Sequence, residues 1–335
     1  MTPRDETEVV DIVRGARARR RRLEIVSGGT RRGFGRPMQC DGVLDMSGLS
    51  GIVTYEPEEL ILTVKPATPL AEIEAALSAR GQRLGFEPQD WRALLGTQGT
   101  PTIGGAVASN ANGPAAIRFG RARDHLLGFR AVNGLAEAYK AGGRVVKNVT
   151  GFDVPKLMCG AMGTLGPMTE MTFRVFPRTR ERIFAASLPA REGFALLRRV
   201  WSSPLEATAL CCANGKAYVR LDGALEEKAA MLRGLGDFAE AQALPGPGMF
   251  ADVPGDVWRL TLAPSQAFEP ATPWFADKAG AELWLSGPCT HPAASMRGGA
   301  PVPPEPPART ALTRAVKAVF DPLGLFNPGR MFEGI

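Results

Sequence analysis

The sequence is poor in the side chains that most often bind metals or transfer protons. It has 335 residues but only two histidines, His125 and His291, and none of its five cysteines forms a Cys-x-x-Cys pair. Iron–sulfur clusters and zinc ribbons are built from such pairs, so neither they nor any other metal site is predicted. The cysteines are expected to be small buried residues in a reducing compartment.

Long apolar runs are missing as well. The first residues, MTPRDE, lack the apolar core of a signal peptide, and no run is long enough to span a membrane. A content of 44% hydrophobic and 22% charged residues is typical of a soluble globular protein. We therefore expect a cytoplasmic protein without an integral membrane segment, which would reach the inner face of the membrane only through partners.

The net charge is +6, and the densest basic cluster consists of Arg17, Arg19, Arg20, Arg21 and Arg22. Two interpretations stay open. The cluster is either the solvated end of a first helix, where cations suit the helix dipole, or a docking patch for an acidic partner or a membrane surface. Because no aromatic residues interleave with these arginines, nucleic acid is not an expected partner.

Two common nucleotide-binding motifs are absent. A Rossmann fold needs Gly-x-Gly-x-x-Gly after its first strand, but Gly33-Phe34-Gly35 is followed by Met38 where the third glycine would fall. A P-loop needs Gly-Lys before Ser or Thr, and the sequence holds no such tripeptide. Any nucleotide bound by this chain is therefore bound in another manner.

The sequence does hold two loops rich in glycine and small hydroxyl residues. Residues 27–35 read SGGTRRGFG, and residues 98–113 read QGTPTIGGAVASNANG. Such loops let backbone N–H groups approach a phosphate closely. Two of them, about 70 residues apart, suggest one dinucleotide held from two sides, although each loop alone is equally well a structural turn.

The first half of the chain predicts a helix followed by a sheet. Thr2 is the expected N-cap of the helix, with Pro3 at its first position and Asp5 completing a capping box. Residues 169–176 alternate between apolar and polar side chains, which is typical of a half-buried strand. Pro177 ends this strand and marks a domain boundary.

The second half predicts the order β-α-β-β-α-β of a ferredoxin-like unit. The first helix of this unit carries Phe194, Leu197 and Trp201 on one face. The strands are expected near residues 183–188, 207–212, 216–221 and 257–262. Residues 287–308 are rich in proline and expected to be irregular, before a last helix at about 308–320.

Six short blocks occur in order along the chain. They are SGGT at 27–30, GVLDMSGL at 42–49, TIGGAVASN at 102–110, GRARD at 120–124, KNVTGFD at 147–153 and GAMGTLG at 160–166. Over about residues 1–178 this set resembles the FAD-binding domain of the vanillyl-alcohol-oxidase and p-cresol-methylhydroxylase (PCMH) type. The block at 147–153, the second half and the ending FNPGRMF at 326–332 are similar to the smaller of the FAD-binding subunits of bacterial glycolate oxidases.

The resemblance implies an α+β fold: a two-subdomain PCMH-type FAD-binding domain over residues 1–178, then a small ferredoxin-like α+β cap domain over residues 179–335. The C-terminal segment would return to the FAD domain. A Pro-Gly turn at 328–329 suits a sharp return. The segment 327–330 either reaches the cofactor region or serves as a simple C-terminal clamp.

The resemblance also implies which residues hold FAD. Backbone N–H groups of the first loop would cradle the pyrophosphate, the second loop would hold its other side, and a third glycine-rich segment would lie near the adenine end. The implied cofactor-binding residues are Ser27, Gly28, Gly29, Thr30, Thr102, Ile103, Gly104, Gly105, Ala106, Val107, Asn110, Gly113, Gly160, Gly163, Thr164, Leu165 and Gly166. Relatives that bind FAD covalently often use a histidine in the first loop, and this loop has none, so non-covalent FAD is predicted.

No catalytic residue is identified. His125 is expected to be structural, and His291 is a candidate acid or base but cannot alone form the paired-histidine metal cage of larger hydroxyacid-oxidising relatives. Oxidising a hydroxy acid also needs a cation for the carboxylate, and the candidates are Arg118, Arg121, Arg123 and Arg330. Lys147 and Asn148 either tune the flavin environment or pin their loop.

The resemblance implies a flavoprotein subunit of a glycolate oxidase complex, which converts glycolate to glyoxylate. Its partners would be a larger FAD-containing subunit and an iron–sulfur subunit, and the substrate of the complex would be a small 2-hydroxyacid. The flavin of this subunit would relay electrons. Two alternatives stay open: a self-sufficient FAD-dependent 2-hydroxyacid dehydrogenase, and a structural flavin subunit without its own turnover. Residues 86–91 would close over the flavin or over a partner.

Overall fold

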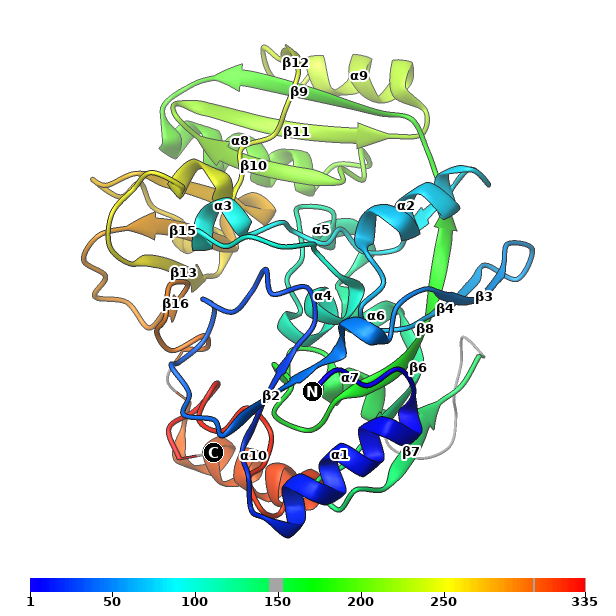
Figure 1. Ribbon diagram of the computed structural model, residues 1–335. Coiled ribbons are helices and arrows are strands. Elements are labelled where there is room, and N and C mark those ends of the chain that lie inside the picture. Colours follow the sequence, from blue (N-terminus) through cyan, green and yellow to red (C-terminus); the bar gives the residue numbers. More distant parts are fainter. Residues whose placement is uncertain (145–152, 304, 335) are drawn as a thin grey trace.

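The computed structural model describes residues 1–144, 153–303 and 305–334. Within these ranges the strands form sheets of two, six and eight strands, and helices pack on them. Figure 1 places α8 (Ala190–Trp201) and α9 (Leu225–Arg233) at the top with part of the eight-stranded sheet, and α1 (Glu6–Ala18) and α10 (Pro307–Phe320) together at the bottom. The predicted α+β class is confirmed.

The chain opens with α1 (Glu6–Ala18) and the parallel strands β1 (Leu23–Val26) and β2 (Gly42–Asp45). The predicted N-cap at Thr2 is wrong. Asp5 caps α1, because its carboxylate accepts a hydrogen bond from the N–H of Glu8 at 2.9 Å. A carboxylate there satisfies an otherwise unpaired N–H group and suits the positive end of the helix dipole.

The six-stranded sheet is antiparallel and runs β3-β4-β8-β6-β7, with β5 added beside the end of β8. Its strands are β3 (Ile52–Glu56), β4 (Ile61–Val64), β5 (Gln82–Leu84), β6 (Leu126–Val132), β7 (Ala138–Gly142) and β8 (Met168–Pro177). The alternation predicted at 169–176 is confirmed: Met171, Phe173 and Val175 are fully buried. The helices between these strands are α2 (Leu70–Ser78), α3 (Arg92–Leu95), α4 (Ile103–Ser109), α5 (Ala116–Phe119), α6 (Ala122–His125) and α7 (Val154–Met158).

The eight-stranded sheet has the order β12-β9-β11-β10-β14-β15-β13-β16. Its first four strands are β9 (Glu181–Ser187), β10 (Ala209–Ala213), β11 (Lys216–Asp222) and β12 (Ala239–Ala241), with α8 (Ala190–Trp201) and α9 (Leu225–Arg233) between them. This is the predicted ferredoxin-like β-α-β-β-α-β order. One strand was assigned wrongly: β12 closes the unit, and residues 257–262 belong to the extension of the sheet.

The extension consists of β13 (Val257–Thr261), β14 (Trp274–Asp277), β15 (Glu282–Ser286) and the short β16 (Ala294–Ser295). β14 joins it to the ferredoxin-like unit by pairing with β10. The presence of β16 corrects the expectation that residues 287–308 are wholly irregular. Trp201 was also placed wrongly: it is 47% exposed, because it ends α8, whereas Phe194 and Leu197 are buried.

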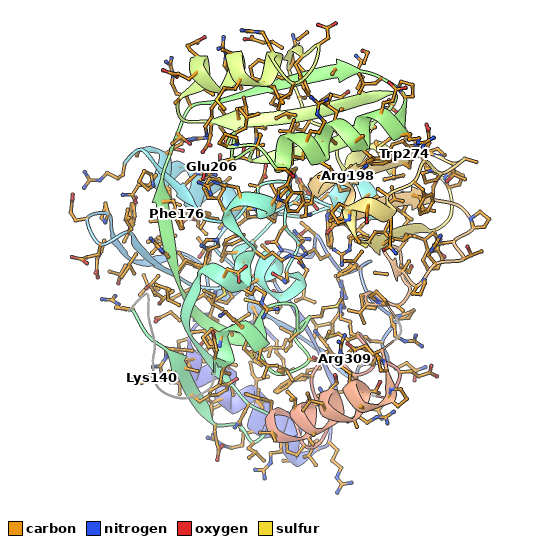
Figure 2. All side chains as sticks on the ribbon, turned by 180° about the vertical axis from the view of Figure 1, so that it is seen from behind. Lys140, Phe176, Arg198, Glu206, Trp274 and Arg309 are labelled. Atoms are coloured by element: carbon orange, nitrogen blue, oxygen red, sulfur yellow. The ribbon has the colours of Figure 1, made fainter. Side chains whose placement is uncertain are left out.

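The last helix, α10 (Pro307–Phe320), leads into a tail that returns to the start of the chain. Leu23 pairs with Phe326 beside β1. The ammonium group of Lys317 is buried and donates to Asp321 Oδ2 at 2.7 Å and to the carbonyl oxygens of Thr164 and Phe326. Figure 2 shows Arg309 of α10 far from Arg198 of α8 and from Trp274 of β14 in the eight-stranded sheet.

Candidate cofactor-binding site

The two glycine-rich loops meet at one small cavity. It lies between the loop after β1 and the start of α4, and six of the predicted site residues line it: Ser27, Gly28, Gly29, Thr30, Thr102 and Gly105. Ser27 Oγ and Thr102 Oγ1 lie 3.0 Å apart and link the two loops directly. The fold thus brings together the segments that the sequence suggested would grip one ligand.

The other predicted residues lie behind this cavity. Ile103, Ala106 and Val107 are buried in the core of the six-stranded sheet, and a Cβ at Gly104 would lie 2.7 Å from the carbonyl oxygen of Pro66. Asn110 caps the end of α4 with Gly160 beside it, and Gly113 faces Glu87. Leu165 is buried in the core of the six-stranded sheet, and Gly163 and Gly166 face the C-terminal tail. Thr164 is buried between these two glycines. Their contact with FAD stays a prediction.

The first loop presents consecutive backbone N–H groups. Within the described part of the chain, the N–H groups of Gly28, Gly29, Thr30 and Arg31 have no hydrogen-bond partner. Gly29 has φ +73°, and a Cβ built there meets no atom within 4 Å. A run of N–H groups around a left-handed residue forms a concave anion-binding nest, which fits a phosphate-bearing cofactor such as FAD.

Backbone contact between the two loops requires glycine at two positions. A Cβ at Gly28 would lie 1.7 Å from the carbonyl oxygen of Thr100, and one at Gly99 would lie 2.2 Å from that of Gly28. Side chains at either position would separate the loops. The two loops are therefore held at a distance that only glycine permits.

The C-terminal tail clamps the first loop from behind. Asn327 accepts a hydrogen bond from the N–H of Ile25 at 2.8 Å and donates to the carbonyl oxygen of Met162 at 2.6 Å. The guanidinium of Arg330 donates to the carbonyl oxygens of Arg31 and Phe34, both at 2.9 Å. These contacts bring Asn327 and Arg330 against the first loop, and both side chains also line the cavity.

One cation of the first loop, Arg31, faces the same cavity. Its Nη1 atom is buried and, among the residues that the structure describes, has no hydrogen-bond partner. Burial lowers the pKa of its guanidinium to about 10, against the opposing charge of Asp90. A buried, unsatisfied donor beside a phosphate nest is the second observation that fits an anionic cofactor.

Neither histidine is arranged for proton transfer at this cavity. The Nε2 atom of His125 lies 2.7 Å from the carbonyl oxygen of Phe119, and its ring packs between Phe86 and Phe176. Burial lowers the pKa of His125, which favours its neutral form. His291 is exposed and packs on Phe268 at 5.2 Å between ring centroids.

The arginines considered for a substrate carboxylate differ in their surroundings. Arg118 pairs with Glu206 at 2.8 Å. Arg330 is engaged with carbonyl oxygens of the first loop. Within the described ranges, Arg121 and Arg123 form no ion pair within 4 Å, so they remain available as candidates.

An aromatic cluster fills the contact between the first loop and the eight-stranded sheet. Trp91 packs edge-on against Phe34 at 4.9 Å and against Trp284 of β15 at 6.1 Å, and Trp284 stacks on Phe275 of β14 at 5.6 Å. All four side chains are buried. Residues 86–91 therefore bridge the two sheets, with Phe86 in the core of one and Trp91 in this cluster.

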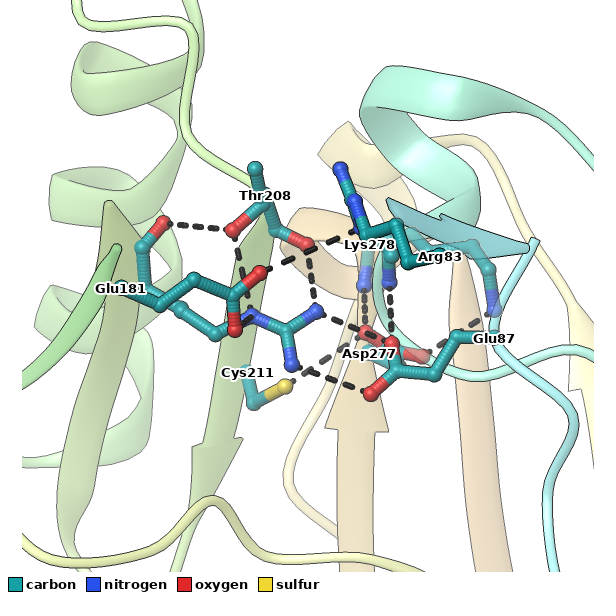
Figure 3. Close-up of polar contacts among 9 residues, drawn as sticks. Arg83, Glu87, Glu181, Thr208, Cys211, Asp277 and Lys278 are labelled. Atoms are coloured by element: carbon teal, nitrogen blue, oxygen red, sulfur yellow. Dashed lines mark hydrogen bonds and ion pairs between the residues drawn. The ribbon is translucent and has the colours of Figure 1, made fainter. Parts of the chain in front are cut away.

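A second junction between the sheets is polar. The guanidinium of Arg220 on β11 forms two hydrogen bonds to the carboxylate of Glu87, at 3.0 and 2.9 Å. Glu87 also accepts from the N–H of Ala115 at 2.9 Å. Figure 3 shows Glu87, Glu181 and Thr208 gathered here, with Cys211, Asp277 and Lys278 nearby.

Sequence reasoning missed Arg31 and the Glu87–Arg220 pair, and it left open what residues 86–91, which end at Trp91, would cover. The two consecutive arginines after SGGT were a signal for Arg31, but nothing in the sequence separates its buried side chain from that of Arg32, which pairs with Glu24. Lys147 and Asn148 lie outside the described residues. In the part of the chain described, no group of three potential metal ligands is found, and no helix has the length and apolar character needed to cross a membrane.

Comparison with known proteins assigns the chain to the flavoproteins of the FAD-linked oxidoreductase class. Residues 1–142 match the protein family described as FAD binding domain. The chain is 33% identical over 337 residues to glycolate oxidase subunit GlcE of Escherichia coli (strain K12), and the match covers 92% of each chain. The chain belongs to the family of GlcE subunits of glycolate oxidase.

Other relatives match a smaller share of this chain. D-2-hydroxyglutarate dehydrogenase of Xanthomonas citri pv. viticola is 32% identical over 60% of this chain and 41% of its own length. Glycolate oxidase subunit GlcD of Bacillus subtilis (strain 168) is 28% identical over 42% of this chain and 29% of its own length. This chain therefore spans less than half of these two longer proteins.

A solved structure supports the same fold. Alkyldihydroxyacetonephosphate synthase aligns with a TM-score of 0.70 over 98% of this chain and 75% of that chain. Its sequence identity is 14%, so the likeness concerns the fold alone.

Proposed function

We propose that this protein is the FAD-binding subunit of a complex that oxidises glycolate to glyoxylate. The observation that carries the proposal is the match to GlcE over 92% of both chains. The unpaired N–H groups of the first loop lie in the segment that the FAD binding domain family covers, and they support it. The D-2-hydroxyacid dehydrogenases are matched over a smaller part of their own length. The self-sufficient dehydrogenase is therefore the weaker alternative.

We propose that the domains divide at residues 178 and 179. In support, β8 of the six-stranded sheet ends at Pro177 and β9 of the eight-stranded sheet begins at Glu181. Residues 1–178 would be the PCMH-type FAD-binding domain and residues 179–335 the cap, with the tail after α10 returning to the FAD domain. The contacts of Asn327 and Lys317 support that return.

FAD would be held without a covalent bond. The glycine-rich first loop, residues 27–35, offers N–H groups and hydroxyls but no histidine or cysteine, the side chains through which flavins are most often linked covalently. The N–H groups of Gly28, Gly29, Thr30 and Arg31 would bind phosphate oxygens, and Ser27 and Thr102 would position the loops. When bound, FAD supplies the two-electron redox chemistry, and the protein sets its position and exclusion from water.

This flavin would relay electrons for the complex. His125 is tied to the carbonyl of Phe119 and is surrounded by aromatic rings, which leaves it poorly placed to accept the hydroxyl proton of a substrate. The aromatic cluster of Phe34, Trp91, Phe275 and Trp284 also fills the contact between the two sheets. Both observations favour substrate oxidation on a partner.

The partners would be a larger FAD-containing subunit, of which GlcD of Bacillus subtilis is an example by name, and an iron–sulfur subunit that carries electrons onward. A cytoplasmic complex that meets the inner face of the membrane through these partners fits this role. The arginine cluster of residues 17–22 remains a candidate docking patch in that complex.

The test is a visible absorption spectrum of the purified chain before and after acid precipitation. A flavin spectrum that moves to the supernatant supports non-covalent FAD, and colour retained in the pellet contradicts it. The same preparation is then given glycolate and a dye acceptor, alone and co-expressed with its partners. Turnover that appears only with the partners supports the relay, whereas turnover by the lone chain establishes the self-sufficient dehydrogenase.

A further inference from the structure

Three arginines line the cavity between the glycine-rich loops, and they differ in how their donors are used. Arg330 donates to carbonyl oxygens of the first loop. Arg32 forms an ion pair with Glu24. Arg31 alone among these three has a buried guanidinium nitrogen, Nη1, without a hydrogen-bond partner in the described ranges.

Two contacts, with Gln89 and with Trp91, hold the side chain of Arg31 in place. Its Nη2 atom donates to the carbonyl oxygen of Gln89, and its Cζ atom lies 4.6 Å from the centre of the Trp91 ring. Stacking on an aromatic face orients a guanidinium and stabilises its charge. The fold therefore fixes Arg31 in one orientation and leaves Nη1 free.

The neighbouring carboxylate does not neutralise Arg31. Asp90 forms hydrogen bonds with the side chain of Arg92 at 2.6 and 2.9 Å and with its backbone N–H at 2.9 Å. No ion pair within 4 Å joins Arg31 to any carboxylate of the described residues. A partly buried cation without an ion-pair partner, one of whose nitrogens is buried without a hydrogen bond, is costly, so an anion in the cavity would stabilise this position.

The anion expected there is defined by the adjacent backbone. The N–H groups of Gly28, Gly29 and Thr30 form a nest on the same loop, and such nests bind phosphate oxygens. N–H dipoles supply only partial charges, whereas a pyrophosphate carries about two negative charges. A full cation at the edge of the nest would complete the neutralisation.

We propose that Arg31, held by Trp91 and Gln89, is the cation that binds the pyrophosphate of FAD through its free Nη1 group. The proposal rests on the proposed function, because it assumes that FAD is the ligand of this cavity. It assigns a specific binding role to a side chain, in addition to the backbone groups of the loop. Arg31 is a binding residue and transfers no proton or electron.

The experiment compares three ligands on the flavin-free full chain. Wild type, Arg31→Gln, Arg31→Lys and the neighbouring control Arg32→Gln are titrated with FAD, FMN and riboflavin, and binding is measured by flavin fluorescence. Thermal unfolding without ligand checks that each variant is folded. A second titration follows the rise in melting temperature with inorganic pyrophosphate, which needs no flavin.

We expect Arg31→Gln to lose affinity for ligands that carry phosphate and to keep its affinity for riboflavin. Arg31→Gln should weaken FAD binding by about 10- to 100-fold, since a charged hydrogen bond is lost, and should weaken riboflavin binding by less than about twofold. Arg31→Lys should recover part of the FAD affinity, and Arg32→Gln should bind like wild type. The stabilisation by pyrophosphate should disappear in Arg31→Gln.

Two results would overturn the proposal. One is unchanged FAD affinity in a folded Arg31→Gln variant, and the other is an equal loss for FAD and riboflavin, which would assign Arg31 to the ring. Failure of the proposed function looks different. In that case wild type binds none of the flavins, and the pyrophosphate titration still decides whether Arg31 binds an anion in this cavity.

Discussion

Neighbouring glycines of the first loop, Gly28 and Gly29, are required for different physical reasons. Gly28 has no room for a side chain, because its Cβ would lie 1.7 Å from the carbonyl oxygen of Thr100. Gly29 has room but a φ of +73°, a left-handed conformation that disfavours other residues by roughly 1–2 kcal/mol. One position is limited by contact and the other by backbone conformation.

We therefore expect Gly28→Ala to destabilise the protein more than Gly29→Ala does. Gly29→Ala should cost about 1 kcal/mol of unfolding free energy. Gly28→Ala must push two backbone segments apart and should cost more than about 2 kcal/mol, in the range seen for overpacking. Urea-induced unfolding of the flavin-free chain measures both. Equal costs would mean that the loops separate easily at Thr100.

At the scale of single elements, the Glu87–Arg220 pair joins the loop after β5 to strand β11. Burial raises the pKa of Glu87, but the hydrogen bond and charge of Arg220 outweigh it and leave the pKa below its ordinary value. A carboxyl group with a lowered pKa contributes stability above its unfolded pKa, and this contribution is lost as the pH falls through the folded value.

This pair predicts a pH dependence. The unfolding free energy of wild type should exceed that of Glu87→Gln by a constant amount between pH 6 and 8. That difference should shrink as the pH falls below about 4.3, where the unfolded carboxyl group begins to take up protons. Urea-induced unfolding of both proteins from pH 3.5 to 8 measures it. A difference that stays constant to pH 3.5 would mean that the charge of Glu87 does not matter.

The elements that the sequence predicted well are those with local signals. The alternation at 169–176 corresponds to β8, and the ferredoxin-like order follows from hydrophobic periodicity. The closing strand β12 escaped prediction, because Ala239–Ala241 is short, lies at the sheet edge and lacks a buried residue. The N-cap was predicted at Thr2 and is Asp5. Both residue types cap helices and they lie within one turn of each other, so the sequence alone does not choose between them.

At the scale of the whole molecule, the candidate site combines segments far apart in the chain. The sequence suggested from their glycine content that the two loops face one ligand, and in the structure both loops line one cavity. The partners of Arg31, Arg220 and Arg330 depend on contacts across 58 to 299 residues, which no local pattern encodes. Family membership was also accessible from the sequence, because the six short blocks are specific in combination.

The buried ammonium of Lys317 fastens the tail to the rest of the molecule. Lys317→Met should lower the unfolding free energy by about 3–5 kcal/mol, since the carboxylate of Asp321 would lose its buried partner. The control is Lys156→Met, which removes an exposed pair with Asp153 and should cost less than about 1 kcal/mol. Urea-induced unfolding measures both, and similar costs would contradict a structural role for the buried pair.

The clamp of Asn327 on Ile25 spans 302 positions of the chain. At roughly 5–20 residues per second, a ribosome needs roughly 15–60 s to travel that distance. During this interval the first glycine-rich loop has been synthesised, but Asn327 and Arg330, which contact it in the folded protein, have not. If these contacts are needed to hold the loop, stable capture of the flavin follows translation of residue 330. We then expect a chain truncated before Asn327 to purify without flavin colour, and a coloured truncated chain would contradict this order.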